Sequence, residues 1–363
     1  MANNKNQHFV PRCYLRNFTV DGENKAINVF NVDKHRFIQC APVKNQCSRD
    51  YFYGKDAKLE RAIQSVESMY ASVSREVMAE KGAVTERQKY ALRTFWLFQN
   101  FRTEAASRRA VEMADELVTT IEAGSEFRLK ISEAVQVAMH AFAENMDAVA
   151  DLKVCVVKNK SAVPFVTSDD PAVLTNRWHF KDARRVGFSF GIQSCGVLAI
   201  LPLSPTLLFI GYDGDVYSVP NKDGWVSIKN DKDADAFNQH QYLNCRANIF
   251  VKDFQSFPAI ECGFESVAGK RLESKHEINY AAYAERVNNY ERYEIIEAEL
   301  VKNRQDVIIH SVRQYPQPLN WPSIIQWRHK GVVYSNGTGM GFIRKSRIDS
   351  SWLPFFKEPS FVR

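Results

Sequence analysis

The sequence predicts an α+β protein in which a layer of long helices packs on an antiparallel or mixed sheet. Two observations carry this prediction. Between residues 57 and 150, apolar residues recur every three or four positions, which is the period of helices with one buried face. After residue 151 the apolar residues alternate or form short continuous runs bounded by turns, as they do in buried strands. We therefore expect helices and sheet to occupy separate parts of the chain.

The N-terminal part is expected to combine an irregular segment with a β-hairpin. Residues 26–32 alternate between apolar and polar side chains and predict a strand, which residues 33–36 turn back into a second strand at 37–41. In the preceding segment Pro11 excludes the interior of a helix, so residues 12–18 fit one short helical turn at most.

Three long helices are expected next. The first ends at Gly82. Thr85 and Gln88 form a capping-box pattern that starts the second helix, and its apolar stripe continues to Gly124. Ser125 is the expected N-cap of the third helix, whose helical period lasts to the end of this block.

The second half is expected to supply the sheet and one buried helix. The helix is predicted over residues 231–245, and the charged stretch 270–305 is also predicted to be helical. The predicted strands are 152–157, 164–175, 195–203, 206–212, 216–219, 247–254 and 307–312. These patterns divide the chain into an N-terminal segment with its hairpin (1–56), a helical layer (57–150), a sheet-rich part of the same domain (151–312) and a Pro- and Gly-rich C-terminal tail (313–363).

Composition restricts the classes of protein and partner. The 363 residues carry a net charge of +6, a balance that is compatible with a nucleic-acid partner without requiring one and that indicates no oligomeric state. Seven cysteines without a C-x-x-C pair argue against a zinc site built on Cys and against a disulfide framework. No apolar run reaches the roughly 18 residues of a spanning helix, and the first residues lack the apolar core of a signal peptide. We expect a cytoplasmic protein with no membrane partner.

Residues 6–18 concentrate polar, aromatic and basic side chains at the N-terminus. His8 and Arg12 are candidate catalytic residues, because a His that titrates near neutral pH and an Arg that binds an anion suit phosphoryl chemistry. The alternative is that both tie this segment to the rest of the protein by hydrogen bonds. Gln7 is a candidate for contacting the substrate of the same site.

A second polar stretch, residues 164–171, follows a predicted strand. Asp169 is the third candidate catalytic residue, because a carboxylate at a strand end can orient a His or bind a divalent metal ion. Ser168 is a candidate for contacting the substrate. The alternative is a turn in which Ser168 and Asp169 bind their own backbone before Pro171. The sequence names no metal-ligand set and no cofactor, although a divalent metal is compatible with these carboxylates.

Arg102 interrupts the apolar face of the second long helix. A buried Arg requires a partner, so Arg102 either pairs with a carboxylate of the fold or contacts the substrate in the same cleft. Asn238 and Asn244 on the predicted helix 231–245 pose a similar question, and hydrogen bonds to a neighbouring strand are the expected answer.

The N-terminal stretch resembles the signature of a large bacterial family of unknown function, DUF4238, which carries an NQH-aromatic-VPR-x-YL-x-x-F motif. The matching residues are Asn6, Gln7, His8, Phe9, Val10, Pro11, Arg12, Tyr14, Leu15 and Phe18. Weaker marks follow at Tyr51–Gly54, Gln99 with Arg102-Thr103, residues 164–171 and Pro202–Pro205, and near Asn238. The family carries Asp-Asn-Pro where this chain has Asp169-Asp170-Pro171, so only the first Asp is comparable. The resemblance implies a shared fold and a site in which His8, Arg12 and Asp169 act together, but no established activity.

The leading hypothesis is therefore a phosphodiester-directed hydrolase, such as a nuclease toxin or a phage-defence effector. Two alternatives remain. One is a non-catalytic protein that binds an anionic ligand or a partner protein through the same residues. The other is an enzyme that acts on a nucleotide, which an enclosed pocket would favour over a groove.

Overall fold

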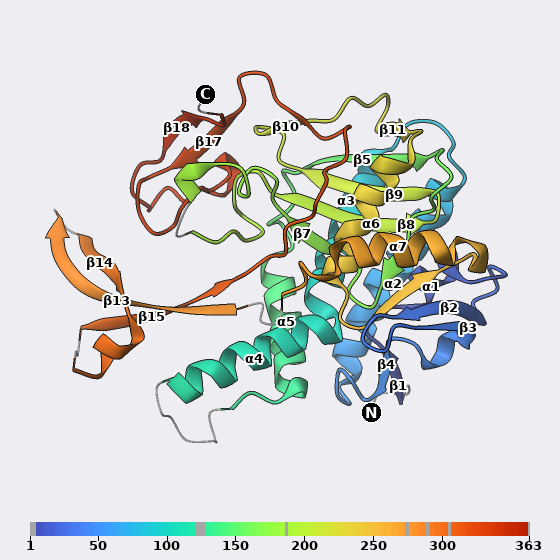
Figure 1. Ribbon diagram of the computed structural model, residues 1–363, viewed down its shortest axis with the longest axis horizontal. Coiled ribbons are helices and arrows are strands. Elements are labelled where there is room, and N and C mark those ends of the chain that lie inside the picture. Colours follow the sequence, from blue (N-terminus) through green and yellow to red (C-terminus); the bar gives the residue numbers. More distant parts are fainter. Residues whose placement is uncertain are drawn as a thin grey trace.

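The protein is an α+β structure, as predicted, and its helices pack against two main sheets where the sequence indicated one (Figure 1). The computed structural model describes residues 5–120, 128–185, 188–272, 276–287, 290–303 and 306–361. The helices are α1 (Arg12–Leu15), α2 (Ala57–Met78), α3 (Glu86–Arg102), α4 (Glu104–Thr120), α5 (Ile131–Glu144), α6 (Asp231–Asn244) and α7 (Phe257–Ala268).

A five-stranded sheet forms the centre of the fold. Its order is β11-β5-β9-β8-β7, and only the β11–β5 pair is parallel, so the predicted antiparallel or mixed sheet is confirmed. Every residue of β8 and β9 is buried, as their continuous apolar sequences indicated. The five strands are β5 (Lys153–Asn159), β7 (Val173–Thr175), β8 (Leu198–Ser204), β9 (Leu207–Tyr212) and β11 (Trp225–Ile228).

The two faces of this sheet are covered by different elements. Val154 and Val156 of β5 pack with α2, α3 and the N-terminal segment in one core cluster. Cys155 and Val157 face the other way, toward α6 and the C-terminal segment. Alternation along a strand thus builds two cores from one sheet.

A four-stranded antiparallel sheet lies beside the first, in the order β3-β2-β12-β6. Phe30 of β2 packs on Phe264 of α7, and a third core cluster fills the space between that sheet, α6 and α7. The strands are β2 (Ala26–Asn31), β3 (Arg36–Pro42), β6 (Thr167–Ser168) and β12 (Asn248–Val251). Smaller pairs are β1 (Asn6–His8) with β4 (Ser48–Asp50), β10 (Tyr217–Ser218) with β16 (Gln326–Trp327), and β17 (Val332–Ser335) with β18 (Phe356–Pro359).

The second predicted helix is broken, which corrects the expectation of a continuous helix to Gly124. Thr103 separates α3 from α4 with extended backbone angles (φ −70°, ψ 157°). Its hydroxyl accepts a hydrogen bond from the backbone N–H of Ala106, in the way of an N-cap, and donates one to Asp170. The apolar period predicts a continuous helix here, but the contact of Thr103 with the distant Asp170 breaks it. The third helix spans Ile131–Glu144, shorter than predicted, and Gly124 and Ser125 lie outside the described residues.

The stretch 270–305 corrects a second prediction, because it is not helical. It contains β13 (His276–Val287) and β14 (Tyr290–Ile296), and β13 also pairs with β15 (Val307–Arg313). The three strands project from the body of the molecule near α4 (Figure 1). The Tyr and Ile residues that satisfy a helical spacing here also favour strands, and pairing with β15 decides between the two structures.

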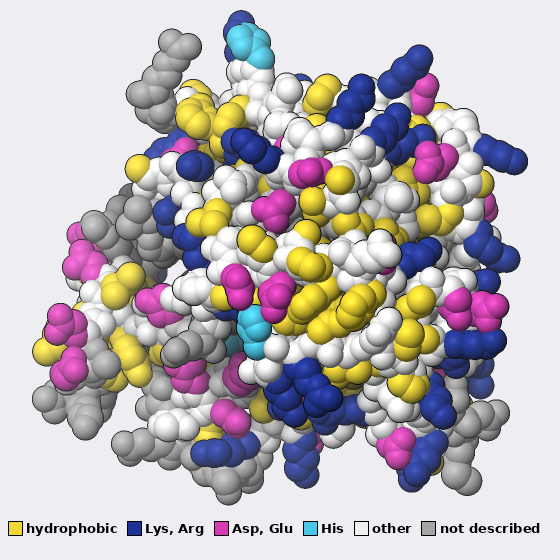
Figure 2. Space-filling model, turned by 45° about the vertical axis from the view of Figure 1, so that its right-hand side comes forward, with side chains coloured by type: hydrophobic (Ala, Val, Ile, Leu, Met, Phe, Trp, Pro, Cys, Tyr) yellow, Lys and Arg dark blue, Asp and Glu magenta, His cyan; other side chains and the backbone are white. Residues whose placement is uncertain are grey.

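The surface mixes charges of both signs. On the face shown in Figure 2, the described basic side chains form several separate groups among acidic and apolar side chains. A nucleic-acid partner would therefore have to be recognised by a local cluster, because the net charge of +6 is not spread as one band over this face.

Candidate functional site

The N-terminal segment is built into the core. Pro11 precedes the single turn of α1, and β1 pairs with β4 so that His8 lies opposite Ser48. The apolar residues of the segment are buried against α2, α3 and the central sheet: Phe9, Val10, Tyr14, Leu15 and Phe18. Its polar side chains therefore sit at the edge of a fixed scaffold.

A small pocket of about 180 Å³ opens beside this segment. Its lining includes His8, Arg12 and Cys13 from the segment, together with residues of the loop before α2, of α2 itself and of α3. Burial and the nearby Glu67 raise the pKa of the Cys13 thiol to about 12, which disfavours a thiolate nucleophile there.

Arg102 holds this pocket together from the C-terminal end of α3. Its guanidinium donates to the backbone oxygen of His8 (2.5 Å), to the hydroxyl of Tyr53 (2.7 Å) and to the carboxylate of Glu67 (2.8 Å). The side chain is fully buried and also lies over the ring of Phe98, 4.4 Å from its centroid. Arg102 therefore pairs with a carboxylate of the fold, one of the two alternatives that its sequence context left open.

His8 combines an ordered backbone with an unsatisfied ring nitrogen. Burial lowers the pKa of its imidazole, although a hydrogen bond with the backbone of Val43 opposes this effect, so the neutral ring predominates at pH 7. Its Nε2 is covered by neighbouring atoms and has no hydrogen-bond partner among the described residues. A buried acceptor without a donor is costly, which marks Nε2 as a position where a ligand proton would be accepted.

Arg12 and Gln7 line the same pocket but differ in how many of their hydrogen-bonding groups are already used. Arg12 is exposed, and its Nη2 donates to the backbone oxygen of Asn24 (3.2 Å). The Gln7 amide is buried, accepting from the Tyr53 backbone N–H (2.7 Å) and donating to the Gly54 oxygen (3.1 Å). Gln7 thus anchors the loop before α2, whereas Arg12 retains donors that can face solvent or an anion.

Asp169 and Ser168 are not part of this pocket lining. The Asp169 carboxylate accepts hydrogen bonds from three successive backbone N–H groups, at residues 246, 247 and 248 (2.8–2.9 Å). Burial raises the pKa of Asp169 to about 6 against the effect of these donors. Ser168 donates to the Gln241 side chain (2.8 Å). Asp169 therefore fixes the turn between α6 and β12, and Ser168 joins β6 to α6.

The two polar stretches nevertheless meet, through Tyr14 and Thr167. The Tyr14 hydroxyl donates to the backbone oxygen of Pro202 (2.8 Å) and lies 2.6 Å from the Thr167 hydroxyl, from which it accepts. All three residues belong to segments that the sequence analysis singled out. The contact between the stretches is therefore a buried structural hydrogen-bond network.

Sequence reasoning did not select Asp170, whose carboxylate is the more deeply buried of the pair. It accepts from Thr103 (2.7 Å) and forms an ion pair with Arg109 of α4. Its backbone oxygen accepts from Asn244 (2.6 Å), while Asn238 binds the backbone of Val166. The expected structural role of both asparagines is confirmed. No local signal in the Asp169-Asp170 pair reveals which carboxylate pairs with a cation.

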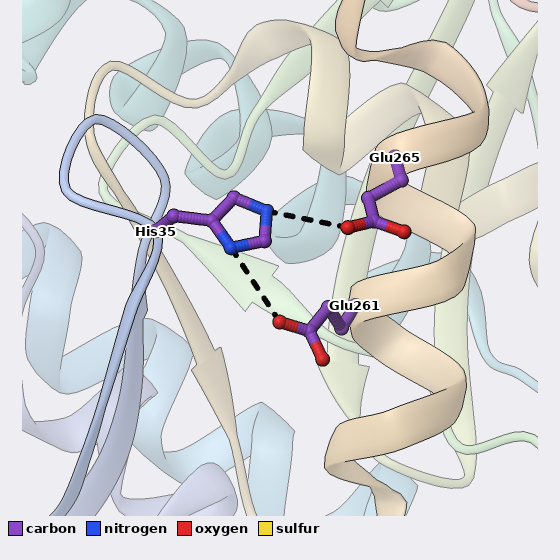
Figure 3. Close-up of side chains that lie close together, drawn as sticks. All are labelled: His35, Glu261 and Glu265. Atoms are coloured by element: carbon purple, nitrogen blue, oxygen red, sulfur yellow. Dashed lines mark ion pairs between the residues drawn. The ribbon is translucent and has the colours of Figure 1, made fainter.

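One group among the described residues has the composition of a metal site, and it lies elsewhere. Figure 3 shows His35, on the turn between β2 and β3, facing Glu261 and Glu265 of α7. Its Nδ1 is 3.5 Å from Glu261 and its Nε2 is 3.5 Å from Glu265. The two ring nitrogens face separate carboxylates, so the arrangement joins the hairpin to α7 as it stands.

Among the described helices, none combines the length and the apolar character needed to cross a bilayer. Comparison with known proteins gives one family match: the family described as Protein of unknown function (DUF4238) matches residues 6–254. No curated protein and no solved structure matches the chain. The matched region covers more than half of the chain, from β1 of the signature through β12. The chain therefore belongs to the DUF4238 family.

Proposed function

We propose that this protein is a phosphodiester-directed hydrolase whose reaction site is the pocket beside the N-terminal segment. The observation that carries the proposal is the free Nε2 of a neutral His8 in a pocket that is also lined by the exposed Arg12. A neutral imidazole is the form that accepts a proton, and a guanidinium matches two phosphate oxygens at once.

The pocket size fits a phosphate group and an attacking water. A volume of about 180 Å³ leaves room for a phosphate group with water beside it. In the proposed reaction Nε2 takes a proton from the water that attacks phosphorus, and Arg12 stabilises the charge that builds on the phosphate oxygens. One ester P–O bond breaks, and the imidazolium returns its proton to the leaving alkoxide, which restores the neutral ring. Because Nε2 is covered in this structure, side chains at the pocket mouth must shift when substrate enters.

The roles of the other candidate residues are positional in this proposal. Arg102 and Gln7 place the backbone of β1 and of the loop before α2, and Asp169 holds the turn that follows α6. These contacts also favour the second candidate function, a non-catalytic protein that binds an anion at Arg12. In that case His8 serves the fold alone.

The test compares purified wild type with His8→Asn and Arg12→Ala on labelled RNA and DNA. Loss of a general base lowers the cleavage rate by about 100- to 10,000-fold, so both variants should lose cleavage while keeping the wild-type melting temperature within a few degrees. Arg16→Ala is the matched control, because Arg16 is exposed on the same segment and likewise donates to a backbone oxygen, that of Gly22.

Two results would contradict the proposal. The first is a wild type that cleaves neither polymer. The second is cleavage that persists in His8→Asn. Binding of phosphate by wild type but not by Arg12→Ala, without any cleavage, would instead support the anion-binding candidate.

A further inference from the structure

A second basic cluster lies where α4 begins, and the proposed reaction does not use it. Its centre is Glu104, whose side chain is only 7% exposed. Arg49 of β4 binds this carboxylate through two hydrogen bonds (2.6 and 3.0 Å), Arg108 through one (2.7 Å), and Arg246 lies 3.5 Å away. Three guanidinium groups from three separate segments thus converge on one carboxylate.

The guanidinium groups remain open to solvent while their shared anion is enclosed. The side chains of Arg49 and Arg246 are 46% and 45% exposed, and that of Arg108 is 32% exposed. One carboxylate cannot use all the donors of three guanidinium groups. Glu104 therefore fixes the positions of cations whose outer donors face solvent, which lowers the entropy that a ligand would otherwise lose in ordering them.

A second group of charged residues lies next to the arginines that contact Glu104. Arg109 follows Arg108 on α4 and pairs with the buried Asp170, and Arg313 of β15 lies close enough to both to interact electrostatically. The Nε of Arg313 is buried without an acceptor among the described residues. Five arginines thus lie close to two carboxylates, those of Glu104 and Asp170. Asp169 adjoins Asp170, and with its charge counted the group still has an excess of two positive charges.

We propose that this cluster, which we call the arginine platform (Arg49, Arg108, Arg109, Arg246 and Arg313), is a binding site for the phosphodiester backbone of a nucleic acid. The planar guanidinium fork matches phosphate geometry, and several forks at fixed spacing suit successive phosphates of a polymer. The ion pairs inside the platform involve Glu104 and Asp170, but they leave the excess charge, the exposed donors and the buried Arg313 Nε unexplained. The inference concerns binding alone and stands whether or not the signature pocket cleaves its substrate.

The experiment measures fluorescence anisotropy of labelled single-stranded RNA, single-stranded DNA and duplex DNA with the full-length protein over a series of salt concentrations. Wild type should bind at least one polymer, and the logarithm of its binding constant should fall linearly with the logarithm of the salt concentration. Arg246→Ala removes a side chain whose one ion pair among the described residues is the 3.5 Å contact with Glu104, so the fold should be kept. We expect weaker binding and a salt slope shallower by about 0.7 to 0.9.

The double variant Arg49→Lys/Arg246→Lys keeps both positive charges but loses the planar guanidinium groups. It should bind the polymer more weakly than wild type, with a nearly unchanged salt dependence. Arg75→Ala is the matched control, an exposed arginine on α2 outside the platform. The readout is binding and not cleavage, which separates this inference from the proposed reaction.

Three outcomes would overturn the inference. They are no polymer bound by wild type at low salt, an Arg246→Ala variant that binds like wild type, and competition by inorganic phosphate at the same concentration as polymer phosphate. The last result would identify a site for a free anion. Capture of an acidic peptide in place of all three polymers would likewise reject the nucleic acid.

Discussion

At the scale of single residues, the hydrogen bond from Arg102 to the backbone of His8 stabilises the fold without using the His8 ring. Arg102 binds the backbone oxygen of His8 and so does not use its ring. The imidazole is thereby positioned through the main chain, with Nε2 left without a partner. The sequence alone presents these residues only as polar side chains in apolar surroundings.

Arg102→Ala is expected to destabilise the protein by about 3 kcal/mol. The variant removes the donor to the buried hydroxyl of Tyr53 and leaves the oxygen of His8 with only the longer bond from that hydroxyl (3.3 Å). It also removes the partner of Glu67, and breaking a buried charged pair costs about 3–5 kcal/mol. Because Glu67 is partly exposed, the lower end of that range applies. Urea denaturation measures the change. Arg75→Ala should stay within about 0.5 kcal/mol of wild type, and an equal loss in both variants would contradict the role given to Arg102.

A pH dependence is expected from His240, which is buried beside Trp321. Burial lowers its pKa to about 3, so the folded protein binds fewer protons than the unfolded chain between pH 6.5 and 3. The free energy of unfolding is therefore not reduced by His240 above pH 6.5. Below that pH it falls by about 1.4 kcal/mol per pH unit, because protons bind to the unfolded chain.

The measurement compares wild type with His240→Leu at pH 7 and pH 4.5. The stability difference between the two proteins should shift in favour of the leucine variant by about 2.7 kcal/mol at the lower pH. The comparison matters because Asp169 and Asp213, whose pKa values burial raises to about 6, change stability in the opposite direction in both proteins. A difference that does not change with pH would refute the assignment.

At the scale of elements, the break between α3 and α4 determines where the charged groups lie. Thr103 ends one helix and caps the next, which turns Arg102 toward the signature pocket and Arg109 toward Asp170. A continuous helix would place residues 102 and 109 on the same face, because they are seven positions apart. The break therefore creates two sites from a single polar stretch.

Thr103→Val should remove both the cap of α4 and the hydrogen bond to Asp170. A lost N-cap costs about 0.5–2 kcal/mol and a lost hydrogen bond to a charged group about 1.5–3 kcal/mol, so we expect a loss of about 2–5 kcal/mol. Thr103→Ser keeps the hydroxyl and should lose less than 1 kcal/mol. Denaturant midpoints of the two variants measure the difference, and similar midpoints would show that the hydroxyl is unimportant.

At the scale of the whole molecule, the N-terminal segment joins elements that are distant in sequence. Tyr14 reaches β6 through Thr167 and β8 through Pro202, while Phe9 and Leu15 pack into the largest core cluster. The segment therefore belongs to the cooperative core, although chain termini commonly lie loose on the surface.

Tyr14→Phe tests this connection with the smallest change of shape. Removal of the hydroxyl leaves the buried oxygen of Pro202 without its donor and should cost about 1–3 kcal/mol in a single cooperative transition. Thermal melts followed at two wavelengths measure this. Two separate transitions in wild type would contradict the inclusion of the segment in one core.

The sequence by itself determined the elements that follow from local chemistry. The helical period of α2, the Thr85–Gln88 capping box, the hairpin of β2 and β3 and the buried strands β8 and β9 could all be predicted, because period, caps and turns depend on near neighbours. The signature could be identified as one unit for the same reason.

Tertiary structure alone decided the break at Thr103, the strands of 276–296 and the partner of each carboxylate. These depend on contacts between distant residues: Asp170 meets Arg109 across 61 positions, and β13 becomes a strand by pairing with β14 and β15. Burial then decides which polar groups keep unused donors or acceptors. It leaves Nε2 of His8 covered but without a donor among the described residues, it leaves the outer faces of Arg49 and Arg246 exposed, and it closes Asp169 and Asp170 within the fold.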